Sequence, residues 1–124
     1  MNATANDRAG QRFRFVILEH DHPFLHWDLL MESGDVLKSW RLLKAVEPGS
    51  WIPAEAIADH RLHYLDYEGP VSKDRGCVSR VAAGRFEVAA GDQIHTKTFS
   101  LYDCDFASSA TVRESSDGPE WCFE

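Results

Sequence analysis

The sequence predicts a mainly β protein, either a β-sandwich or a β-barrel, with short, mostly antiparallel strands and one or two short helical turns. Short runs of apolar and aromatic residues recur at close spacing along the 124 residues. Clusters of Gly, Pro, Asp and Ser separate these runs, and such clusters are typical of turns. Because few segments favour a helix, we expect packed strands to supply the core.

Length and composition are those of one globular domain. A chain of 124 residues with 44% hydrophobic and 27% charged residues can bury a core without disulfides. Residues 1–12 are polar and predict a flexible tail, which leaves 13–124 as the domain. The net charge of −7 argues against a large basic groove for nucleic acid. Without a membrane-spanning apolar run or a signal-peptide core, we expect a cytoplasmic protein with no membrane contact.

The first part of the domain predicts three strands. Phe13–Glu19 carries apolar side chains on both faces, which favours a buried strand. Pro23 interrupts the pattern, and Phe24–Glu32 resumes it as a second strand. The turn residues Ser33–Asp35 then lead into a third strand at Val36–Leu42, so the second and third strands form a hairpin.

The rest of the chain predicts shorter elements. Pro53–Asp59 has a proline near its start and favours a short helical turn. Arg61–Tyr67 alternates weakly and indicates a strand, and Gly91–Asp92 marks a later turn. The remaining strands are expected at Cys77–Ala82, Gly84–Ala89, His95–Leu101 and Ala110–Glu114, with a last edge strand at Glu120–Phe123.

A candidate metal site lies between the first two strands. His26 and Asp28 are two residues apart in a strand, so their side chains leave the same face. His20 ends the preceding strand, and the short break can return it to that face; His22 and Asp21 are nearby alternatives. Two imidazoles and a carboxylate suit a divalent metal ion. The alternative is an exposed polar face of a half-buried sheet.

A second cluster contains His60 and Tyr64, which a strand would place on one face. Beside a metal ion, these side chains are suited to phosphate binding or proton transfer, although aromatic-rich strands more often pack in cores. A metal-dependent dioxygenase is another reading, with His60 or His95 as the distal ligand to the His26 and Asp28 pair. Only Arg113 could then anchor a keto-acid.

Three segments together resemble a known family. They are HDHPFLHWDLLME, VLKSW and DHRLHYLDYEG, which begin at His20, Val36 and Asp59. The 3′-phosphoesterase domain of bacterial DNA ligase D carries similar segments, HDATRLHYDFRLE, GVLKSWAVPKG and DHPLEYLDFEG. The order and spacing of all three agree from about Phe13 to Gly69, and the likeness is weak after Gly69.

This resemblance implies a small closed or partly closed β-barrel that trims 3′ ends with a divalent metal ion, typically Mn²⁺, with Zn²⁺ or Co²⁺ as alternatives. It implies His20, His26 and Asp28 as metal ligands, with His60 and Tyr64 acting on the phosphate. The implied substrates are 3′ ends of DNA or of RNA/DNA strands that carry a terminal ribonucleotide or phosphate. A ligase or polymerase would be the repair partner in trans.

The sequence departs from the family where cations would hold the phosphate. The family's arginine two residues after the metal aspartate is Leu30 here, and a second arginine is replaced by Phe24. Glu19 replaces a lysine. Leucine cannot supply the two-pronged grip of arginine on a phosphate. The family's lysine survives as Lys44, and the other cations that could compensate are Arg41, Arg75 and Arg80.

Three functions follow from these observations. The first is a metal-dependent 3′-phosphoesterase in DNA repair, weakened by Leu30. The second is a non-catalytic module that retains the metal and binds a strand end or a partner. The third is a phosphoesterase for a small phosphorylated substrate, which the acidic net charge of −7 favours over a long polyanion.

Overall fold

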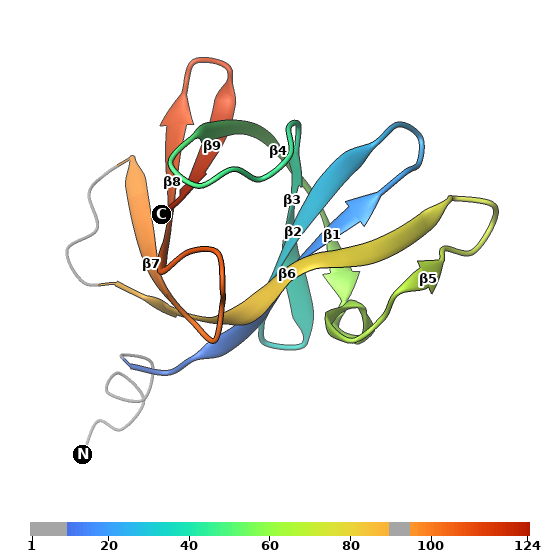
Figure 1. Cartoon of the computed structure of the whole chain (residues 1–124), viewed down its shortest axis with the longest axis horizontal. Coiled ribbons are helices and arrows are strands. Elements are labelled where there is room, and N and C mark those ends of the chain that lie inside the picture. Colours follow the sequence, from blue (N-terminus) through green and yellow to red (C-terminus); the bar gives the residue numbers. More distant parts are fainter. Residues whose placement is uncertain (1–9, 90–94) are drawn as a thin grey trace.

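The computed structural model describes residues 10–89 and 95–124. Within these ranges one sheet of nine strands and a single 3₁₀ helix account for the regular structure (Figure 1). The elements are β1 (Phe13–His20), β2 (His26–Ser33), β3 (Val36–Leu42), β4 (Trp51–Arg61), η1 (Leu62–Leu65), β5 (Gly69–Pro70), β6 (Cys77–Val88), β7 (Thr96–Tyr102), β8 (Ser109–Ser115) and β9 (Gly118–Phe123).

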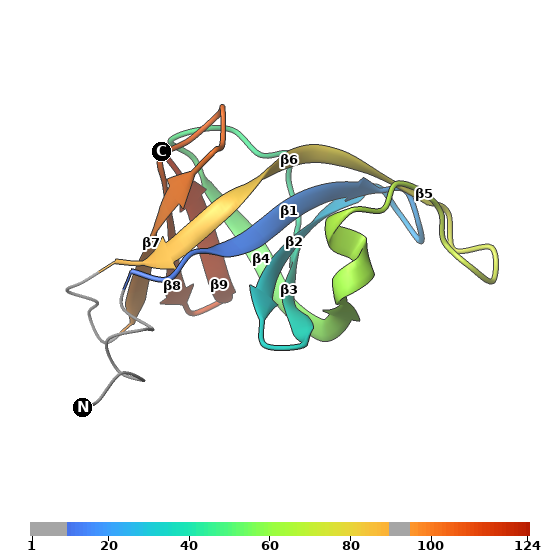
Figure 2. The ribbon, with the colours of Figure 1, turned by 90° about the horizontal axis from the view of Figure 1, so that it is seen from below.

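The sheet closes into an antiparallel barrel. Its strand order is β1-β2-β3-β4-β9-β8-β7-β6-β5, and β1 also pairs with β6. That second pairing removes the free edges of β1 and β6 and closes an eight-stranded barrel, with β5 attached to β6 outside it. Figures 1 and 2 show η1 and β5 together on one side, beside the end of β6. The predicted mainly β barrel is confirmed.

One hydrophobic cluster fills the barrel. Each of the eight barrel strands contributes to it, and Trp121, which is fully buried, lies among the large side chains. The rings of Phe99 and Phe123 stack near Trp121, and Trp40 meets it edge-on with ring centroids 5.1 Å apart. Such aromatic contacts add to the stability that burial of apolar area provides.

A second hydrophobic cluster lies on the outer face of β1, β2 and β3, under the segment from η1 to β6. Its buried members are Val16, Leu18, Leu30, Leu37, Leu65, Val71 and Val78. Side chains alternate along a strand, so β1 sends Phe15 and Ile17 into the barrel and Val16 and Leu18 into this outer cluster. The expectation of a strand that is buried on both faces is confirmed.

The predicted helical turn at Pro53–Asp59 is wrong, because these residues lie within β4. The composition of the segment favours a helix, but β3 pairs along it and β9 pairs with its start. Ile52 and Ala54 alternate into the barrel core, which only a strand allows. Long-range pairing therefore overrides local propensity here.

Three other strand predictions need correction. Arg61–Tyr67 is not a strand, because its central residues form η1. The strands expected at Cys77–Ala82 and Gly84–Ala89 form one long strand, β6, and the last strand is not an edge, since β9 pairs with both β4 and β8. The second strand begins at His26 rather than Phe24. The turn at Gly91–Asp92 lies outside the described residues.

The predicted tail, residues 1–12, falls mostly outside the described residues. Its last residue is described, and the Arg12 guanidinium lies 3.5 Å from the Tyr102 ring centroid and 3.6 Å from a Glu87 carboxylate oxygen. No helix in the described part of the chain is long and apolar enough to cross a membrane.

Replacing Leu30 with arginine is expected to destabilise the fold. Leu30 is fully buried in the outer cluster, so a guanidinium there would be desolvated among apolar side chains. We expect Leu30→Arg to lower the free energy of unfolding by at least about 3 kcal/mol, and Leu30→Met by less than about 1.5 kcal/mol. Urea unfolding followed by tryptophan fluorescence measures both values. Equal urea midpoints for Leu30→Arg and wild type would show that the outer cluster does not enclose this position.

Candidate metal centre and phosphate site

The three predicted metal ligands converge at the end of the β1–β2 hairpin where residues 21–25 connect the two strands. His20 and His26 are direct cross-strand partners, and Asp28 follows two residues along the same face of β2. One potential ligand atom from each residue lies within 4.8 Å of the other two. His26 and Asp28 are buried, at 1% and 3% exposed, while His20 is partly exposed. The group could therefore hold a metal ion.

Hydrogen bonds fix which ring nitrogens of the two histidines face Asp28. His26 Nδ1 donates to the Phe24 carbonyl oxygen at 2.9 Å, and His20 Nε2 donates to the Arg75 carbonyl oxygen at 2.8 Å. In neutral imidazoles, His26 Nε2 and His20 Nδ1 are then lone-pair atoms, 3.1 and 3.4 Å from the Asp28 carboxylate oxygens. Backbone carbonyls orient metal-binding histidines in this way in many proteins.

The Asp28 carboxylate provides an independent indication of a cation. Its Oδ1 atom is buried and has no hydrogen-bond partner. When both imidazoles are neutral, their nitrogens that face Asp28 carry lone pairs, so hydrogen-bond acceptors face each other at 3.1 and 3.4 Å. Leaving a buried carboxylate oxygen unpaired is costly. A divalent cation would satisfy all three groups, and the nitrogen and oxygen donors suit Mn²⁺, Zn²⁺ or Co²⁺.

A strap at residues 71–77 holds the carbonyl that orients His20. Asp21 Oδ1 accepts a hydrogen bond from the Cys77 backbone N–H at 2.8 Å. Gly76 has φ +75°, and a Cβ built there would lie 2.2 Å from Asp21 Oδ1 and 2.7 Å from the Cβ of His22. Only glycine therefore permits both the backbone angle and the close approach. Residue types alone do not reveal this contact, because it joins two loops that are distant along the chain.

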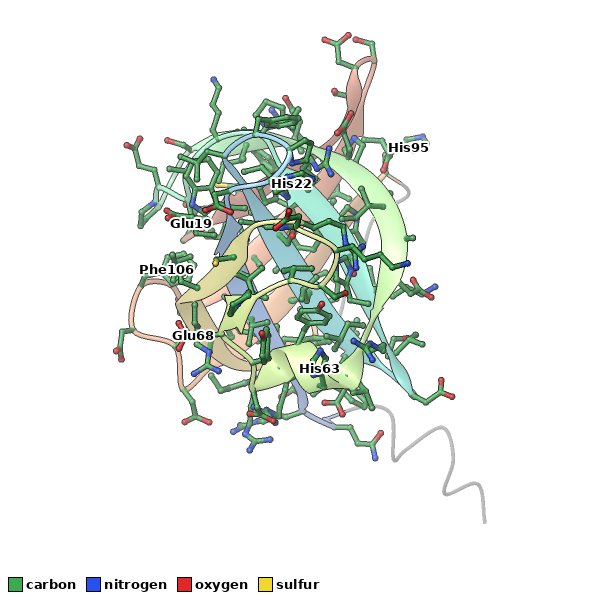
Figure 3. All side chains as sticks on the ribbon, turned by 90° about the vertical axis from the view of Figure 1, so that its right-hand side faces the viewer. Glu19, His22, His63, Glu68, His95 and Phe106 are labelled. Carbon is green, nitrogen blue, oxygen red and sulfur yellow. The ribbon has the colours of Figure 1, made fainter. Side chains whose placement is uncertain are left out.

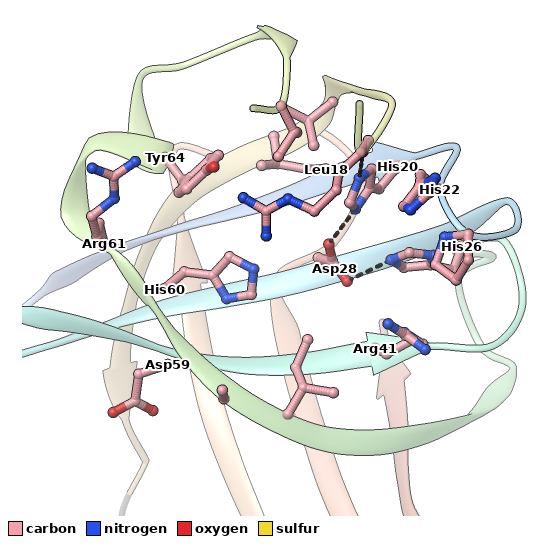
Figure 4. Close-up of a pocket in the computed structure, with 16 residues that line it drawn as sticks. Leu18, His20, His22, His26, Asp28, Arg41, Asp59, His60, Arg61 and Tyr64 are labelled. Atoms are coloured by element: carbon pink, nitrogen blue, oxygen red, sulfur yellow. Dashed lines mark hydrogen bonds and ion pairs between the residues drawn. The ribbon is translucent and has the colours of Figure 1, made fainter. Parts of the chain in front are cut away.

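An open cavity of about 570 Å³ adjoins the metal group. Figure 4 shows His60 and Tyr64 on the opposite side of Asp28 from His26. Both residues line the cavity, as do the metal group and the side chains of Arg41 and Arg75. The structure thus brings together the two clusters that the sequence suggested.

His60 is held by a residue that sequence reasoning missed. Ser39 on β3 is 3% exposed, and its hydroxyl donates to the Leu37 carbonyl oxygen at 2.9 Å. The Ser39 hydroxyl oxygen lies 2.8 Å from His60 Nδ1 and can accept a hydrogen bond from the N–H group there. The other ring nitrogen, Nε2, then carries the lone pair. The alternation of β3 could have indicated Ser39, since it lies on the same face as Arg41.

Burial lowers the pKa of His60 from its ordinary value of 6.5. Asp28, the Ala58 carbonyl and Asp59 act in the opposite direction, and His20 adds to the lowering. Desolvation is the largest effect because it disfavours the charged imidazolium. The folded protein therefore favours a neutral His60, which is a proton acceptor.

Tyr64 reaches the cavity from η1. Its ring meets that of His60 edge-on, with centroids 5.6 Å apart. The end of η1 is tied to the barrel by Arg14, whose Nη2 donates to Asp66 Oδ1 at 2.6 Å, and this bond lowers the pKa of the Asp66 carboxyl. His60 and Tyr64 meet because β4 runs directly into η1, whereas the sequence prediction placed both on a strand.

The predicted phosphate-binding cations do not all lie at the cavity. Arg41 and Arg75 line it, while Lys44 is exposed in the loop after β3 and is not among the lining residues. Arg80 donates to the Leu65 carbonyl oxygen at 3.2 Å. His95 is also absent from the cavity lining, and Figure 3 shows it at the upper right, whereas His63 lies on η1 near the bottom of that view.

A comparison with protein families identifies the chain. The model of the DNA ligase D 3′-phosphoesterase domain matches residues 18–112 of the 124. The chain belongs to this family. The matched range includes every residue of the metal group and both His60 and Tyr64. Membership supports an end-processing role of the kind that the family name describes.

A curated relative in this family is the multifunctional non-homologous end joining protein LigD of Pseudomonas aeruginosa. It is 35% identical to the chain over 60 residues, which are 47% of the chain and 7% of that protein. The similarity therefore concerns a small part of a much longer protein. The relative's other activities carry no direct information about this phosphoesterase-family chain.

Substituting Gly76 should weaken metal binding. In Gly76→Ala the new Cβ would displace the strap from Asp21 and move the Arg75 carbonyl away from His20. Loss of such an orienting contact typically weakens metal binding by about 10–100-fold. Gly34→Ala is the matched control, because Gly34 has φ +65° and nothing lies within 4 Å of its added Cβ. Calorimetric titration with Mn²⁺ measures both variants, and equal affinities would contradict the role of the strap.

The low pKa of His60 predicts a pH-dependent stability. The unfolded chain binds a proton at His60 below pH 6.5, whereas the folded chain does so only at lower pH. His60 therefore stabilises the fold fully above pH 6.5 and loses this contribution as the pH falls. We expect the difference in unfolding free energy between wild type and His60→Gln, in EDTA, to shrink from pH 7.5 to pH 5. An NMR titration that places the His60 pKa at or above 6.5 would contradict this.

Proposed function

We propose that the chain is a divalent-metal-dependent phosphoesterase that removes the phosphate from 3′ ends of DNA during repair. A terminal 3′ ribonucleotide would be trimmed in an earlier step, which leaves the 3′-phosphate. The observation that carries this proposal is the convergence of the buried Asp28 carboxylate, whose Oδ1 atom has no hydrogen-bond partner, with two oriented imidazoles beside a cavity that His60 and Tyr64 line. A DNA-repair role would place the chain in the cytoplasm.

His20, His26 and Asp28 would hold the metal ion, and Mn²⁺ is the ion that we propose. When bound, it supplies charge that polarises the phosphoryl oxygens and offsets negative charge in the transition state. The protein contributes ligand atoms that are already oriented, because both imidazoles are anchored to backbone carbonyls. Burial of Asp28 and His26 keeps bulk water from these atoms.

His60 is suited to move the proton. Its Nε2 atom carries a lone pair, because Nδ1 is held by Ser39, and burial favours the neutral ring. We propose that Nε2 accepts a proton from the water that attacks phosphorus. The bond between phosphorus and the 3′ oxygen breaks, and the resulting imidazolium donates the proton to that oxygen. The products are a 3′-hydroxyl end and inorganic phosphate.

Tyr64 and Arg75 would bind the substrate. The Tyr64 hydroxyl can donate a hydrogen bond to a phosphoryl oxygen beside His60. Arg75 lines the same cavity, although its guanidinium also donates to the Ser72 carbonyl oxygen at 2.9 Å. With a net charge of −7, the protein attracts a long polyanion weakly. We therefore propose that it contacts only the end of a strand and works beside a ligase or polymerase in trans.

Turnover of a primer with a 3′-phosphate tests this function. With Mn²⁺ we expect a 3′-hydroxyl product and free phosphate, and no product in EDTA. Asp28→Asn should lose metal binding and slow turnover on the order of 10³-fold or more. Asp117→Asn, in the turn between β8 and β9, is the charge-matched control.

Two outcomes would favour the alternatives. A Mn²⁺-loaded protein that binds the primer end without turning it over would indicate a non-catalytic end-binding module. Cleavage of small phosphate esters but not of the primer would indicate a small phosphorylated substrate.

A further inference from the structure

Arg41 occupies a special position beside the metal group. It is the direct cross-strand partner of Asp28 in the β2–β3 pair. Residues opposite each other in antiparallel strands extend from the same face of the sheet, so Arg41 shares the face of the metal group. It lines the cavity, and Figure 4 shows it on the other side of Asp28 from His60 and Tyr64.

The guanidinium of Arg41 lacks an acceptor. The Arg41 Nε atom is buried and has no hydrogen-bond partner. Within residues 10–89 and 95–124 the Arg41 guanidinium makes no ion pair, and it makes a cation–π contact with the Phe24 ring. The other arginines in these ranges each have a hydrogen-bond or ion-pair partner: Arg12, Arg14, Arg61, Arg75, Arg80, Arg85 and Arg113. A buried donor that stays unpaired in the free protein indicates a ligand that supplies the acceptor.

Phe24 holds this guanidinium in place. The Arg41 Cζ atom lies 5.3 Å from the centroid of the Phe24 ring, which is a cation–π contact. Contact through the ring face leaves the N–H groups at the edge of the guanidinium available for hydrogen bonds. Phe24 is itself 52% exposed and belongs to no strand, because it lies in the segment between β1 and β2. The aromatic ring therefore orients Arg41 without competing for its donors.

From these contacts we infer that Arg41 binds the terminal phosphate of the substrate, in place of the arginine that the family carries at the position of Leu30. This inference rests on the proposed function. Leu30 is fully buried in the outer cluster and is uncharged, so position 30 supplies no cation to the cavity in this chain. Arg41 stands where the family segment AVPKG begins with alanine, so this chain gains a cation on β3 where it loses one on β2. A phosphate at the metal group would be held by Arg41 from one side and by His60 and Tyr64 from the other.

The kinetics of Arg41 variants test this role. We expect Arg41→Ala to lower kcat/KM for the 3′-phosphate primer by about 10²–10³-fold. Arg41→Lys should recover only part of this loss, because an ammonium lacks the two-pronged geometry. Added guanidinium chloride at millimolar concentration should partly rescue Arg41→Ala but not the wild type. Arg85→Ala, which removes an exposed arginine that pairs with Asp103, is the charge-matched control.

Phosphate binding provides a readout that does not require turnover. In Mn²⁺-loaded protein we expect inorganic phosphate to bind Arg41→Ala at least about 10-fold more weakly than wild type, with the affinity for Mn²⁺ itself unchanged. Equal phosphate affinities, or equal kcat/KM values, for Arg41→Ala and wild type would overturn the inference while leaving the proposed function intact. Absence of turnover in wild type, with weakened phosphate binding in Arg41→Ala, would instead contradict the proposed function and support the inference.

Discussion

The structure depends on the double pairing of β1. This strand bonds to β2 on one side and to β6 on the other, and so closes the barrel. A strand in that position has no polar face, because one row of its side chains enters the barrel and the other enters the outer cluster. His20 is the last residue of β1 and follows the residues that β1 contributes to the two hydrophobic clusters. The metal group is therefore attached to two neighbouring strands, β1 and β2, that are each paired on both sides, which suits a site whose ligands must not move.

The sequence predicts those parts of the site that follow from local alternation. The period-two pattern of β1 to β3 is strong, and it correctly places His26 and Asp28 on one face of β2. His20 lies on that same face of the sheet, as the cross-strand partner of His26. The missed features depend on contacts between distant segments. Pro53–Asp59 has a helical composition, and only pairing with β3 and β9 makes it a strand. The Arg75 carbonyl reaches His20 from a loop 55 residues away along the chain, and a backbone atom leaves no trace in residue types.

The candidate phosphate-binding residues Arg41 and Lys44 show the same limit of prediction from the sequence. Arg41 and Lys44 are both candidates in the sequence, and they lie three residues apart near the end of the predicted third strand. The structure separates them, since β3 ends at Leu42 and only Arg41 is registered against Asp28. The end of the strand and its register therefore decide which of the two cations lines the cavity. The sequence pattern predicts the end at Leu42, whereas the register against β2 follows only from the structure.

The outer face of β2 changes character between Asp28 and Leu30. The first side chain faces a cavity with oriented imidazoles, and the second is enclosed by apolar groups from β1, β3 and the strap. This boundary explains why an arginine at position 30 and the present outer cluster exclude each other: a charge there would need water or an anion where Leu65, Val71 and Val78 now pack. A neighbouring strand can carry an arginine to the cavity without placing a charge in this cluster. β3 is the one that faces Asp28 directly, and its residue there is Arg41.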